Sequence, residues 1–483
     1  MHHIWNIPEL LAHILLFLDD KSDLLQCALV CRAFSVEAAR IIWREVEDFH
    51  HLLGCFPHNT ISTEESGPVN CPSRTFLFLH LPDTTEWDHM RSRASMIKEL
   101  TFSDLDNYDA LLEVIQRHKI DLTFPELISL HLHNSVTKRF QTFLPLFAAS
   151  RLQELEITFD GYNDRLINTT VEALLAQAHP LRSLQIAATS LPELSQNYVI
   201  QLLENTPSID YLCLMVDTLD GEDIVQAAAQ LPQLRELDVK LSDDGERTEY
   251  SVGFQSLVSL DTWSLYTSAL AIARAIISPN MERVRMRVLG EIIGPPGSLF
   301  QTIASMANLN SVSLTFYNSD IPQWADVEPL LSCRFISTFA IASPGMEIDD
   351  RAISSISRAW PNLTRLRLAG LEDTPIRFTR PSLHGLTELL VRCPKLQDLT
   401  LEVDARVSQL QAALASATRA SLEPREKLLF NVRRSLIDQD SEVAISEFLM
   451  SVWPGECDVE SWWRDEWQED AWGQVRELMQ QRE

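Results

Sequence analysis

Arginines at alternate positions mark two short stretches of this sequence. Arg283, Arg285 and Arg287 form one row, and Arg365 and Arg367 form a second. Residues two apart lie on one face of a β-strand, so each row would project its guanidinium groups in one direction. A planar guanidinium donates paired hydrogen bonds to carboxylates and phosphates. These rows therefore favour binding of an acidic or phosphorylated segment, with simple solubility as the alternative role.

A second group of residues has the types that bind zinc. Zinc prefers imidazole and thiolate ligands, and such side chains gather at His50, His51, Cys55 and His58. No second, well-spaced pair completes a four-ligand pattern, so no metal and no cofactor are expected. The eight cysteines include no CxxC pair, which is typical of free thiols in a reducing compartment.

Catalytic signatures are missing from the sequence. It has no glycine-rich phosphate loop, GxSxG, HExxH or kinase pattern. With only 14 glycines, the chain is poor in the backbone freedom that phosphate loops need. We therefore predict no catalytic residues and a non-enzymatic protein. An enzyme whose site uses dispersed residues is the weaker alternative.

A repeated phrase sets the register of the arginine rows. It consists of an apolar residue, two variable residues, an apolar residue, one variable residue and an apolar residue. Its starts lie 23 to 33 residues apart, which is the period of a leucine-rich repeat. Proline precedes many starts by one or two residues and would end the preceding helix. The twelve starts are Ile97, Leu127, Leu152, Leu181, Ile209, Leu234, Leu257, Met281, Leu309, Ile336, Leu363 and Leu396.

Each repeat is predicted to be one strand and one helix that cannot bury its own apolar face. Stacking about 12 of them makes an α/β fold, a curved solenoid with a parallel sheet on the concave side. Helical patterns at 170–175, 223–228 and 349–353 support this prediction. An ordinary α/β sheet, the alternative, would not repeat so evenly. The arginine rows would then face the concave side, among acidic residues and roughly 15 Å apart.

Segments of other composition flank the repeats. We expect a connector with a helix at 48–53, an exposed loop at 58–72 and a strand at 75–81. Beyond residue 403 the patterns predict a helix at 408–419, a strand at 427–432 and a helix at 441–452. Inward-facing aromatics of the acidic tail would cap the solenoid, with an aromatic binding motif as the alternative. These aromatics are Trp453, Trp462, Trp463, Trp467 and Trp472.

The stretch from Ile7 to Trp43 reads as three short helices with surplus apolar surface. Pro8 suits the first turn of a helix, and Leu10, Leu11, Ile14, Leu15 and Leu18 recur at helical spacing. The block from Leu24 to Cys31 is apolar nearly all round, as in a helix contacted from two sides. Three helices cannot bury this much apolar surface among themselves, so another surface must cover it.

In order and density these residues resemble an F-box. The resemblance rests on Ile7-Pro8-Glu9-Leu10-Leu11, Ile14-Leu15, Leu18-Asp19, Leu24, Cys27, Leu29-Val30-Cys31-Arg32 and Trp43. It departs from the family at Ile7, where Leu is usual, and at Phe34, where Trp is common. The resemblance implies docking on a Skp-type adaptor and, through it, a cullin. A helical cap that only packs on the next domain is the alternative. The implied adaptor-binding residues are Ile7, Pro8, Leu10, Leu11, Ile14, Leu15, Leu18, Leu24, Leu25, Leu29, Val30 and Trp43.

Taken together, the box and the repeats resemble F-box/leucine-rich-repeat proteins, especially the divergent kind found in fungi. This implies a substrate-recognition subunit of a Skp–cullin–F-box ubiquitin ligase with an unknown protein target. A non-catalytic scaffold without a ligase role is the alternative. The net charge of −28 over 483 residues argues against nucleic acid or an anionic membrane as partner.

Four segments and a location follow from these patterns. The expected domains are an F-box at 1–47, a connector with an irregular first repeat at 48–95, the solenoid at 96–403, and a last repeat with an acidic Trp-rich cap at 404–483. Neither a secretion signal nor a membrane-spanning stretch is evident. We therefore expect a cytoplasmic or nuclear protein, or one found in both places.

Overall fold

A computed structural model of the chain divides into two compact units, residues 1–219 and 220–483. Each unit is described by itself. The structure describes residues 7–18, 20–66, 73–102, 108–132, 147, 151–159, 172, 180–188, 193–216, 222–241, 249–317, 322–344, 346–370, 380–406, 427–438, 440–453, 455–461 and 466–480.

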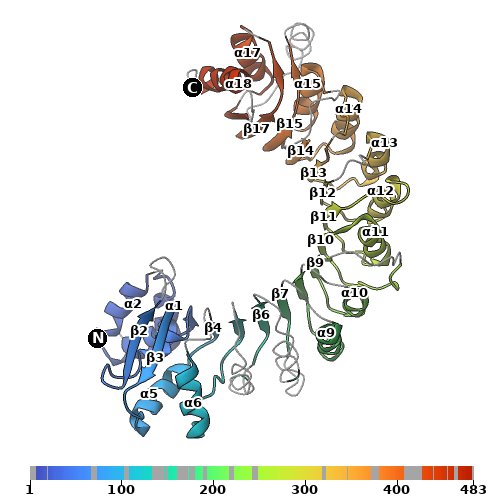
Figure 1. Cartoon of the computed structure of the whole chain (residues 1–483). Helices are drawn as coiled ribbons and strands as arrows, with labels where there is room; N and C mark the ends of the chain where they lie inside the picture. The colour runs from blue at the N-terminus through green and yellow to red at the C-terminus, as the bar shows by residue number, and fades with distance from the viewer. Residues whose placement is uncertain are drawn as a thin grey trace. The chain divides into compact units, whose positions relative to one another are not determined.

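The first unit begins with three helices and continues into parallel strands (Figure 1). Strand β1 pairs with β4, and β4 to β8 then pair in sequence order. Strands β2 and β3 form a separate antiparallel hairpin. The elements are α1 (Pro8–Leu15), α2 (Lys21–Ala28), α3 (Arg32–Ile42), β1 (Glu45–Val46), α4 (His50–Leu53), β2 (Ile61–Ser66), β3 (Ser73–Phe78), α5 (Thr84–Ala94), β4 (Glu99–Phe102), α6 (Asp109–Arg117), β5 (Ser129–Leu132), β6 (Glu154–Phe159), β7 (Ser183–Ala188), α9 (Glu193–Asn205) and β8 (Tyr211–Val216).

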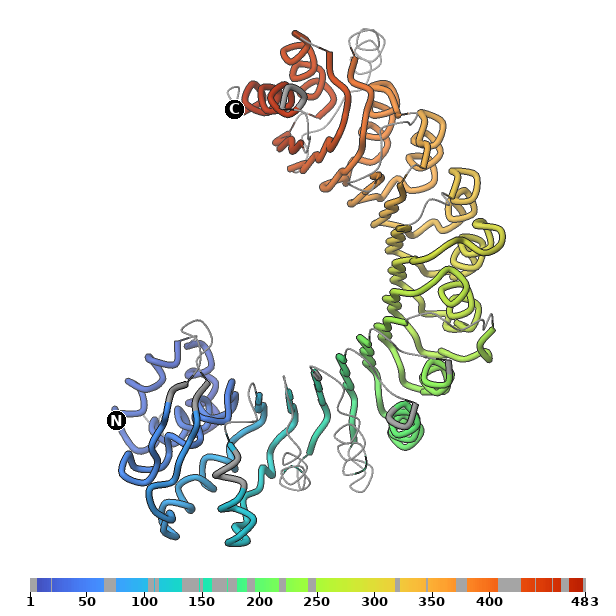
Figure 2. Tube along the Cα trace, in the orientation of Figure 1, coloured from blue at the N-terminus to red at the C-terminus, as the bar shows by residue number. Residues whose placement is uncertain are grey.

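The second unit alternates strands and helices, and its helices lie on one side of its parallel sheet (Figures 1 and 2). Strands β9 to β15, then β17 and β19, are neighbours in that order. Strands β16 and β18 form a separate parallel pair. The elements are α10 (Glu222–Ala229), β9 (Glu236–Lys240), β10 (Ser259–Leu265), α11 (Tyr266–Ala275), β11 (Arg283–Leu289), α12 (Gly297–Ala304), β12 (Ser311–Phe316), α13 (Trp324–Val327), the 3-10 helix η4 (Glu328–Ser332), β13 (Thr338–Ala342), α14 (Asp350–Ala359), β14 (Arg365–Ala369), α15 (Leu383–Arg392), β15 (Asp398–Leu401), β16 (Asp404–Ala405), β17 (Leu428–Arg433), β18 (Leu436–Ile437), α17 (Glu442–Val452), β19 (Cys457–Ser461) and α18 (Glu466–Gln480).

The repeat prediction is confirmed, because each of the twelve phrases carries one strand of a parallel sheet. Along β8, for example, Leu212, Leu214 and Val216 are buried while the residues between them are partly exposed. Thr262 breaks the apolar pattern in β10, yet it is fully buried and donates a hydrogen bond to Ser264 at 3.3 Å. The pairing of two buried hydroxyls offsets the cost of a polar residue in this core.

Successive repeats are linked by side-chain caps at the helix starts. The Asp349 carboxylate accepts a hydrogen bond from the backbone of Ala352 and begins α14. The next residue, Asp350, accepts hydrogen bonds from the backbone and hydroxyl of Ser382, at 2.7 and 2.6 Å. Ser382 in turn caps α15. Capping therefore fixes the starts of α14 and α15, and the contact of Asp350 with Ser382 ties these two repeats together.

Near the N-terminus, one sequence-based prediction was wrong and one strand was not predicted. The predicted loop at 58–72 contains strand β2, whose backbone hydrogen bonds to β3 override a loop-like composition. Strand β1 lies at residues 45–46, so the sheet begins well before the first phrase at Ile97. Phe49 is fully buried and stacks on Phe102 at 4.9 Å, which joins this early segment to the first repeats.

In the C-terminal tail, Trp453 and Trp472 are buried, and the Trp472 indole donates to the Ser435 carbonyl at 3.0 Å. Strand β19 was not predicted, because its five residues alternate too briefly to show a pattern. Capping of the solenoid by these aromatics stays a prediction. The helices predicted at 170–175 (except residue 172) and 408–419, Trp462, Trp463 and the side chain of Trp467 lie outside what is described.

Gly253 lies where the backbones of two repeats come close together. A Cβ atom at this position would lie 2.3 Å from the Ala229 carbonyl oxygen. We expect Gly253→Ala to lower the free energy of unfolding by about 1–3 kcal/mol, because the backbone must move. In Gly473→Ala, the matched control in helix α18, the new Cβ meets nothing within 4 Å. The free energy of unfolding of Gly473→Ala should rise by about 0.4–1 kcal/mol. Urea titration of both variants tests the difference, and equal effects would contradict it.

Candidate functional site

Helices α1, α2 and α3 share a small core of their own. Leu11, Leu15, Leu24 and Ala38 are its buried members, and Phe34 is among the partly buried residues packed on it. Asp20 begins α2 by accepting a hydrogen bond from the backbone of Ser22 at 2.7 Å. This core fixes the three helices relative to one another and so determines which of their side chains point outward.

The outward side of α1 and α2 is apolar and exposed. Leu29 is 81% exposed, Val30 is 68% exposed and Leu25 is 55% exposed. Apolar side chains at this exposure are unusual when they gather on neighbouring turns, and such patches are typical of surfaces that contact another molecule. The predicted adaptor-binding residues that are exposed are Ile7, Pro8, Leu10, Ile14, Leu25, Leu29 and Val30, and those that are partly buried are Leu18 and Trp43.

Leu11, Leu15 and Leu24, which the sequence also predicted to bind the adaptor, are not on this exposed side. They are at most 4% exposed and fill the internal core, because a helix on a domain surface buries one face and presents the other. Their side chains therefore support the exposed apolar side from within. Sequence reasoning also missed Leu16 and Phe17, which are exposed at the end of α1. Phe17 sits in the apolar run from Ile14 to Leu18, and that run was the available signal.

Trp43 connects the helices to the segment that follows. The Arg93 guanidinium of α5 lies over its indole ring, 5.7 Å from the ring centroid. A cation on an aromatic face contributes about 0.5–1 kcal/mol at exposed sites. Trp43 therefore has a partner within this chain and is shared between an internal contact and the proposed surface.

In the second unit, the arginines of both rows are paired with acids one or two strands away. Asp261 of β10 contacts Arg285 at 3.2 Å and Arg287 at 3.5 Å. Asp398 of β15 contacts Arg365 at 3.1 Å and Arg367 at 2.6 Å. Arg283 contacts Glu236 of β9 at 3.1 Å. Sequence reasoning placed acids around these rows but missed the specific pairs, because cross-strand register is not visible in one sequence.

Aromatic rings lie beside the first arginine row. Trp263 of β10 stacks with Tyr317, which follows β12, at 6.2 Å between ring centroids and an interplanar angle of 7°. Lys240 and Arg287 lie over the indole, at 4.9 and 5.5 Å from its centroid. These contacts hold Arg287 against the sheet, and its side chain is the least exposed of the five arginines.

The carboxyl group of Asp238 in β9, beside the first arginine row, has a strongly raised pKa. Burial and the neighbouring charge of Asp261 raise the pKa of Asp238 to about 6, although Arg287 and Arg285 act in the opposite direction. Its Oδ1 atom is buried without a hydrogen-bond partner. A carboxylate held this way is less stable when ionised than it would be in water.

This perturbation predicts a pH-dependent stability. The pKa of Asp238 is higher in the folded state than in the unfolded state. Its contribution to the free energy of unfolding is therefore present at low pH and is lost as the pH rises through about 6. Asp238→Asn stays neutral, so it should match the wild type near pH 4 and be more stable above pH 7. Urea midpoints across this range check the prediction. A constant difference between the two proteins at all pH values would contradict it.

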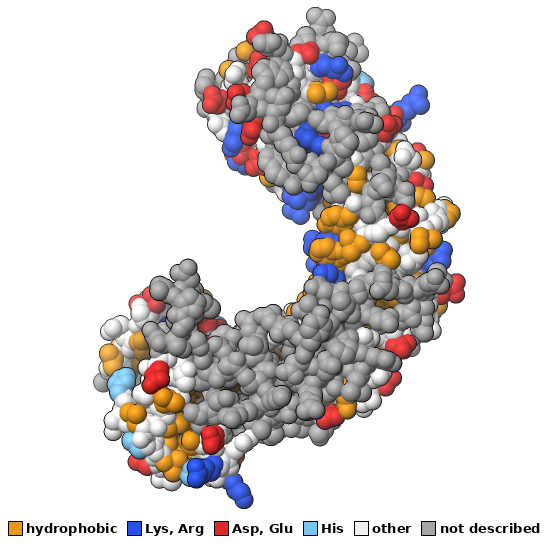
Figure 3. All heavy atoms as spheres, in the orientation of Figure 1, with side chains coloured by type: hydrophobic (Ala, Val, Ile, Leu, Met, Phe, Trp, Pro, Cys, Tyr) orange, Lys and Arg blue, Asp and Glu red, His pale blue; other side chains and the backbone are white. Residues whose placement is uncertain are grey.

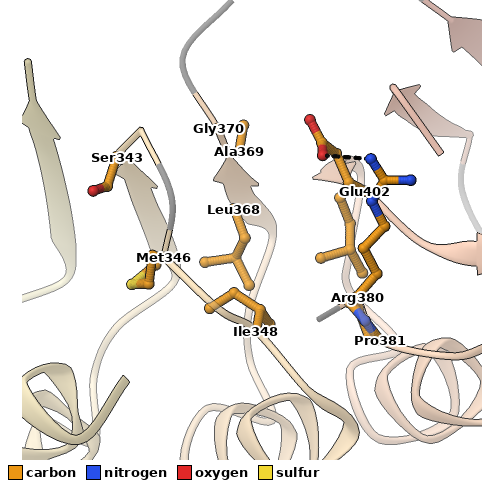
Figure 4. A pocket seen from close by; sticks show the side chains of 10 residues that line it. Ser343, Met346, Ile348, Leu368, Ala369, Gly370, Arg380, Pro381 and Glu402 are labelled. Atoms are coloured by element: carbon orange, nitrogen blue, oxygen red, sulfur yellow. Dashed lines mark hydrogen bonds and ion pairs between the residues drawn. The ribbon is translucent and has the colours of Figure 1, made fainter. Parts of the chain in front are cut away.

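A small pocket lies at the carboxyl ends of β13, β14 and β15 (Figure 4). Met346, Ile348 and Leu368 give it apolar walls, and Arg380 and Glu402 lie at one end. The carboxylate of Glu402 contacts Arg380 at 3.4 Å and Arg434 at 3.2 Å.

These three charged side chains are at most 15% exposed. Burial lowers the pKa of Arg380 and Glu402 raises it. One carboxylate is thus shared by two guanidinium groups, so these three side chains keep a net charge of +1. Arg380 also has one nitrogen, Nη1, that is buried without a hydrogen-bond partner.

Metal ligands and membrane spans can be judged for the described residues only. They contain no group of three His, Cys, Asp or Glu side chains placed to hold a metal, and this covers His50, His51, Cys55 and His58. No helix among them is long and apolar enough to cross a membrane.

Comparison with known proteins gives a family match and similarity to solved structures. A family model described as F-box-like matches residues 8–47. No curated protein matches the chain. Among solved structures, the chain is similar to one titled "Crystal structure of Rad7 and Elc1 complex in yeast", with 16% identity and a TM-score of 0.37. The match covers 60% of this chain and 76% of that one.

Proposed function

We propose, starting from the F-box-like domain that residues 8–47 form, that this chain is a substrate-recognition subunit of a Skp–cullin–F-box ubiquitin ligase. The domain would bind a Skp-type adaptor, and the adaptor would bind a cullin. The strand side of the repeats would bind the protein target. The chain itself would break no bond; it would hold the target near the conjugating enzyme and so raise its effective concentration.

The observation that carries this proposal is the division of faces in α1 and α2. Leu11, Leu15 and Leu24 are buried in the domain's own core, whereas Leu25 and Leu29 are more than half exposed. A domain that served only to cap the next one would bury such residues against it. Exposed leucines on a folded, self-supporting core are what a docking surface for another protein requires.

Co-expression tests the function. The full-length chain, carrying an affinity tag, is produced with a Skp-type adaptor and a cullin and then purified on the tag. We expect all three proteins in one peak in size-exclusion chromatography, and no cullin when the adaptor is omitted. If the chain is soluble but does not co-purify with the adaptor when the two are co-expressed, the result would support the alternative, an interaction scaffold with no role in ubiquitin ligation.

A further inference from the structure

Strands β12 and β13 separate the two arginine rows by a strip of small side chains. In the parallel register, each residue of one strand lies beside one residue of the next strand, so lines of neighbouring residues cross the sheet from β11 to β14. Ser311, Ser313, Thr338 and Ala340, here called the floor, are all partly exposed. Figure 3 shows Lys and Arg side chains at two places along the strand side of this unit. The two lines of neighbours are Arg283–Ser311–Thr338–Arg365 and Arg285–Ser313–Ala340–Arg367.

All five arginines lean away from the floor. Their carboxylate partners are on β9 and β10 at one side and on β15 at the other. The floor therefore stays uncovered by these long side chains. Because it consists of small residues, the backbone of a ligand could approach the sheet closely between the two rows.

Each row also keeps a surplus of positive charge over its ion-pair partners. The three arginines of β11 share two carboxylates, Glu236 and Asp261. The two arginines of β14 share one, Asp398. Asp238 lies one strand farther from the floor than Asp261. A guanidinium that shares its carboxylate still has N–H groups to donate to a second anion.

The spacing of the rows defines the ligand. Three strand spacings separate β11 from β14, which is about 14 Å. An extended peptide rises about 3.3–3.4 Å per residue, so side chains four residues apart span the same distance and point the same way. The floor hydroxyls can hydrogen-bond the backbone groups that an extended segment leaves unpaired. An α-helix already pairs its backbone groups internally and would gain less from these hydroxyls.

We propose that the floor binds an extended peptide segment that crosses β11 to β14 and carries two anionic side chains four residues apart. One anion would contact Arg283 and Arg285, and the other would contact Arg365 and Arg367. The identification of this segment as part of a ubiquitin-ligase target rests on the proposed function. The binding of two anionic groups by the arginine rows does not depend on that function. Aspartate, glutamate and phosphorylated side chains share this chemistry.

Labelled synthetic peptides test the proposal with the full-length chain. One peptide carries two glutamates four residues apart, a second carries two phosphoserines at the same positions, and a third carries two lysines. Fluorescence anisotropy should show binding of at least one anionic peptide, weakening as salt rises, and no binding of the lysine peptide. The anionic peptide that binds more tightly identifies carboxylate or phosphate as the preferred group. Failure of both anionic peptides to bind would overturn the proposal.

Variants assign the binding to this surface. Reversing charge on both sides of the floor, with Arg285→Glu and Arg367→Glu together, should weaken the bound peptide at least about tenfold. The control reverses Arg358 and Arg392, which also share one carboxylate, Glu388, but lie on helices α14 and α15. Equal affinities of these two double variants would contradict the proposal. Ala340→Trp fills the floor without changing its charge and should also weaken peptide binding. This second variant keeps the test valid if the charge-reversed variant does not fold.

Adaptor binding, measured on the same samples, separates the two proposals. Loss of the peptide interaction with normal adaptor binding would contradict only the floor as a peptide site. Peptide binding by a chain that does not bind the adaptor would contradict only the ubiquitin-ligase function.

Discussion

Leu29→Asp should weaken adaptor binding at least about a hundredfold. Leu29 is 81% exposed, so its substitution costs the free chain little stability. In the complex the side chain would be covered, and an aspartate there would be a buried charge without a partner. Truncation of a hot-spot residue at the centre of an interface costs about 2 kcal/mol or more, and an unpaired buried charge adds to that loss. Isothermal titration calorimetry of each variant with the purified adaptor measures the affinity.

Two control variants make this result specific. Val443→Asp places the same charge at an apolar residue of α17 that is 54% exposed, and it should leave adaptor affinity unchanged. Leu15→Ala removes a core side chain, so it should lower the stability of the helical domain by about 2–5 kcal/mol. If Leu29→Asp binds the adaptor as tightly as the wild type does, the exposed face of α1 and α2 is not the docking surface.

Glu402→Ala should be among the most destabilising single substitutions in the second unit. It removes the carboxylate that both Arg380 and Arg434 contact, and these guanidinium groups are only 6% and 15% exposed. Breaking a buried pair by removing one partner costs about 3–5 kcal/mol, because an uncompensated charge stays inside. Denaturant unfolding of the full-length chain should show a clear loss of stability.

Glu388→Ala is the matched control for this prediction. Glu388 also lies between two arginines, Arg358 and Arg392, but these are 65% and 46% exposed. Water screens such pairs, so this substitution should cost about 0–1 kcal/mol. Equal losses from Glu388→Ala and Glu402→Ala would show that the charge cluster at the pocket is not desolvated as the structure indicates.

The repeats were predictable because their signal is repeated. Leu366 and Leu399, for example, occupy the same place in two successive phrases and are neighbours in the sheet. Strand β1 has only two residues and no phrase, so its membership depends on pairing with Glu99 and Leu100, which sequence patterns do not show.

The candidate surfaces were predictable in type but not in detail. Helical spacing identified Leu11 and Leu15 as apolar positions of one helix, but it could not tell that they face inward while Leu10 and Ile14 face outward. Both sets are leucine or isoleucine, and only the packing of α3 decides between them. Likewise, the pairing of Asp261 with Arg285 depends on a register that becomes visible only once the sheet is formed.

Hydroxyl-radical footprinting of the full-length chain, with and without a Skp-type adaptor, tests the division of faces most directly, because it reports side-chain exposure. We expect Phe17, Leu25 and Leu29 to be oxidised in the free chain and protected in the complex. Leu11 and Leu15 should stay unreactive in both, and the exposed Phe335 of the second unit should react equally in both. Full oxidation of Leu25 and Leu29 in the presence of saturating adaptor would contradict the account.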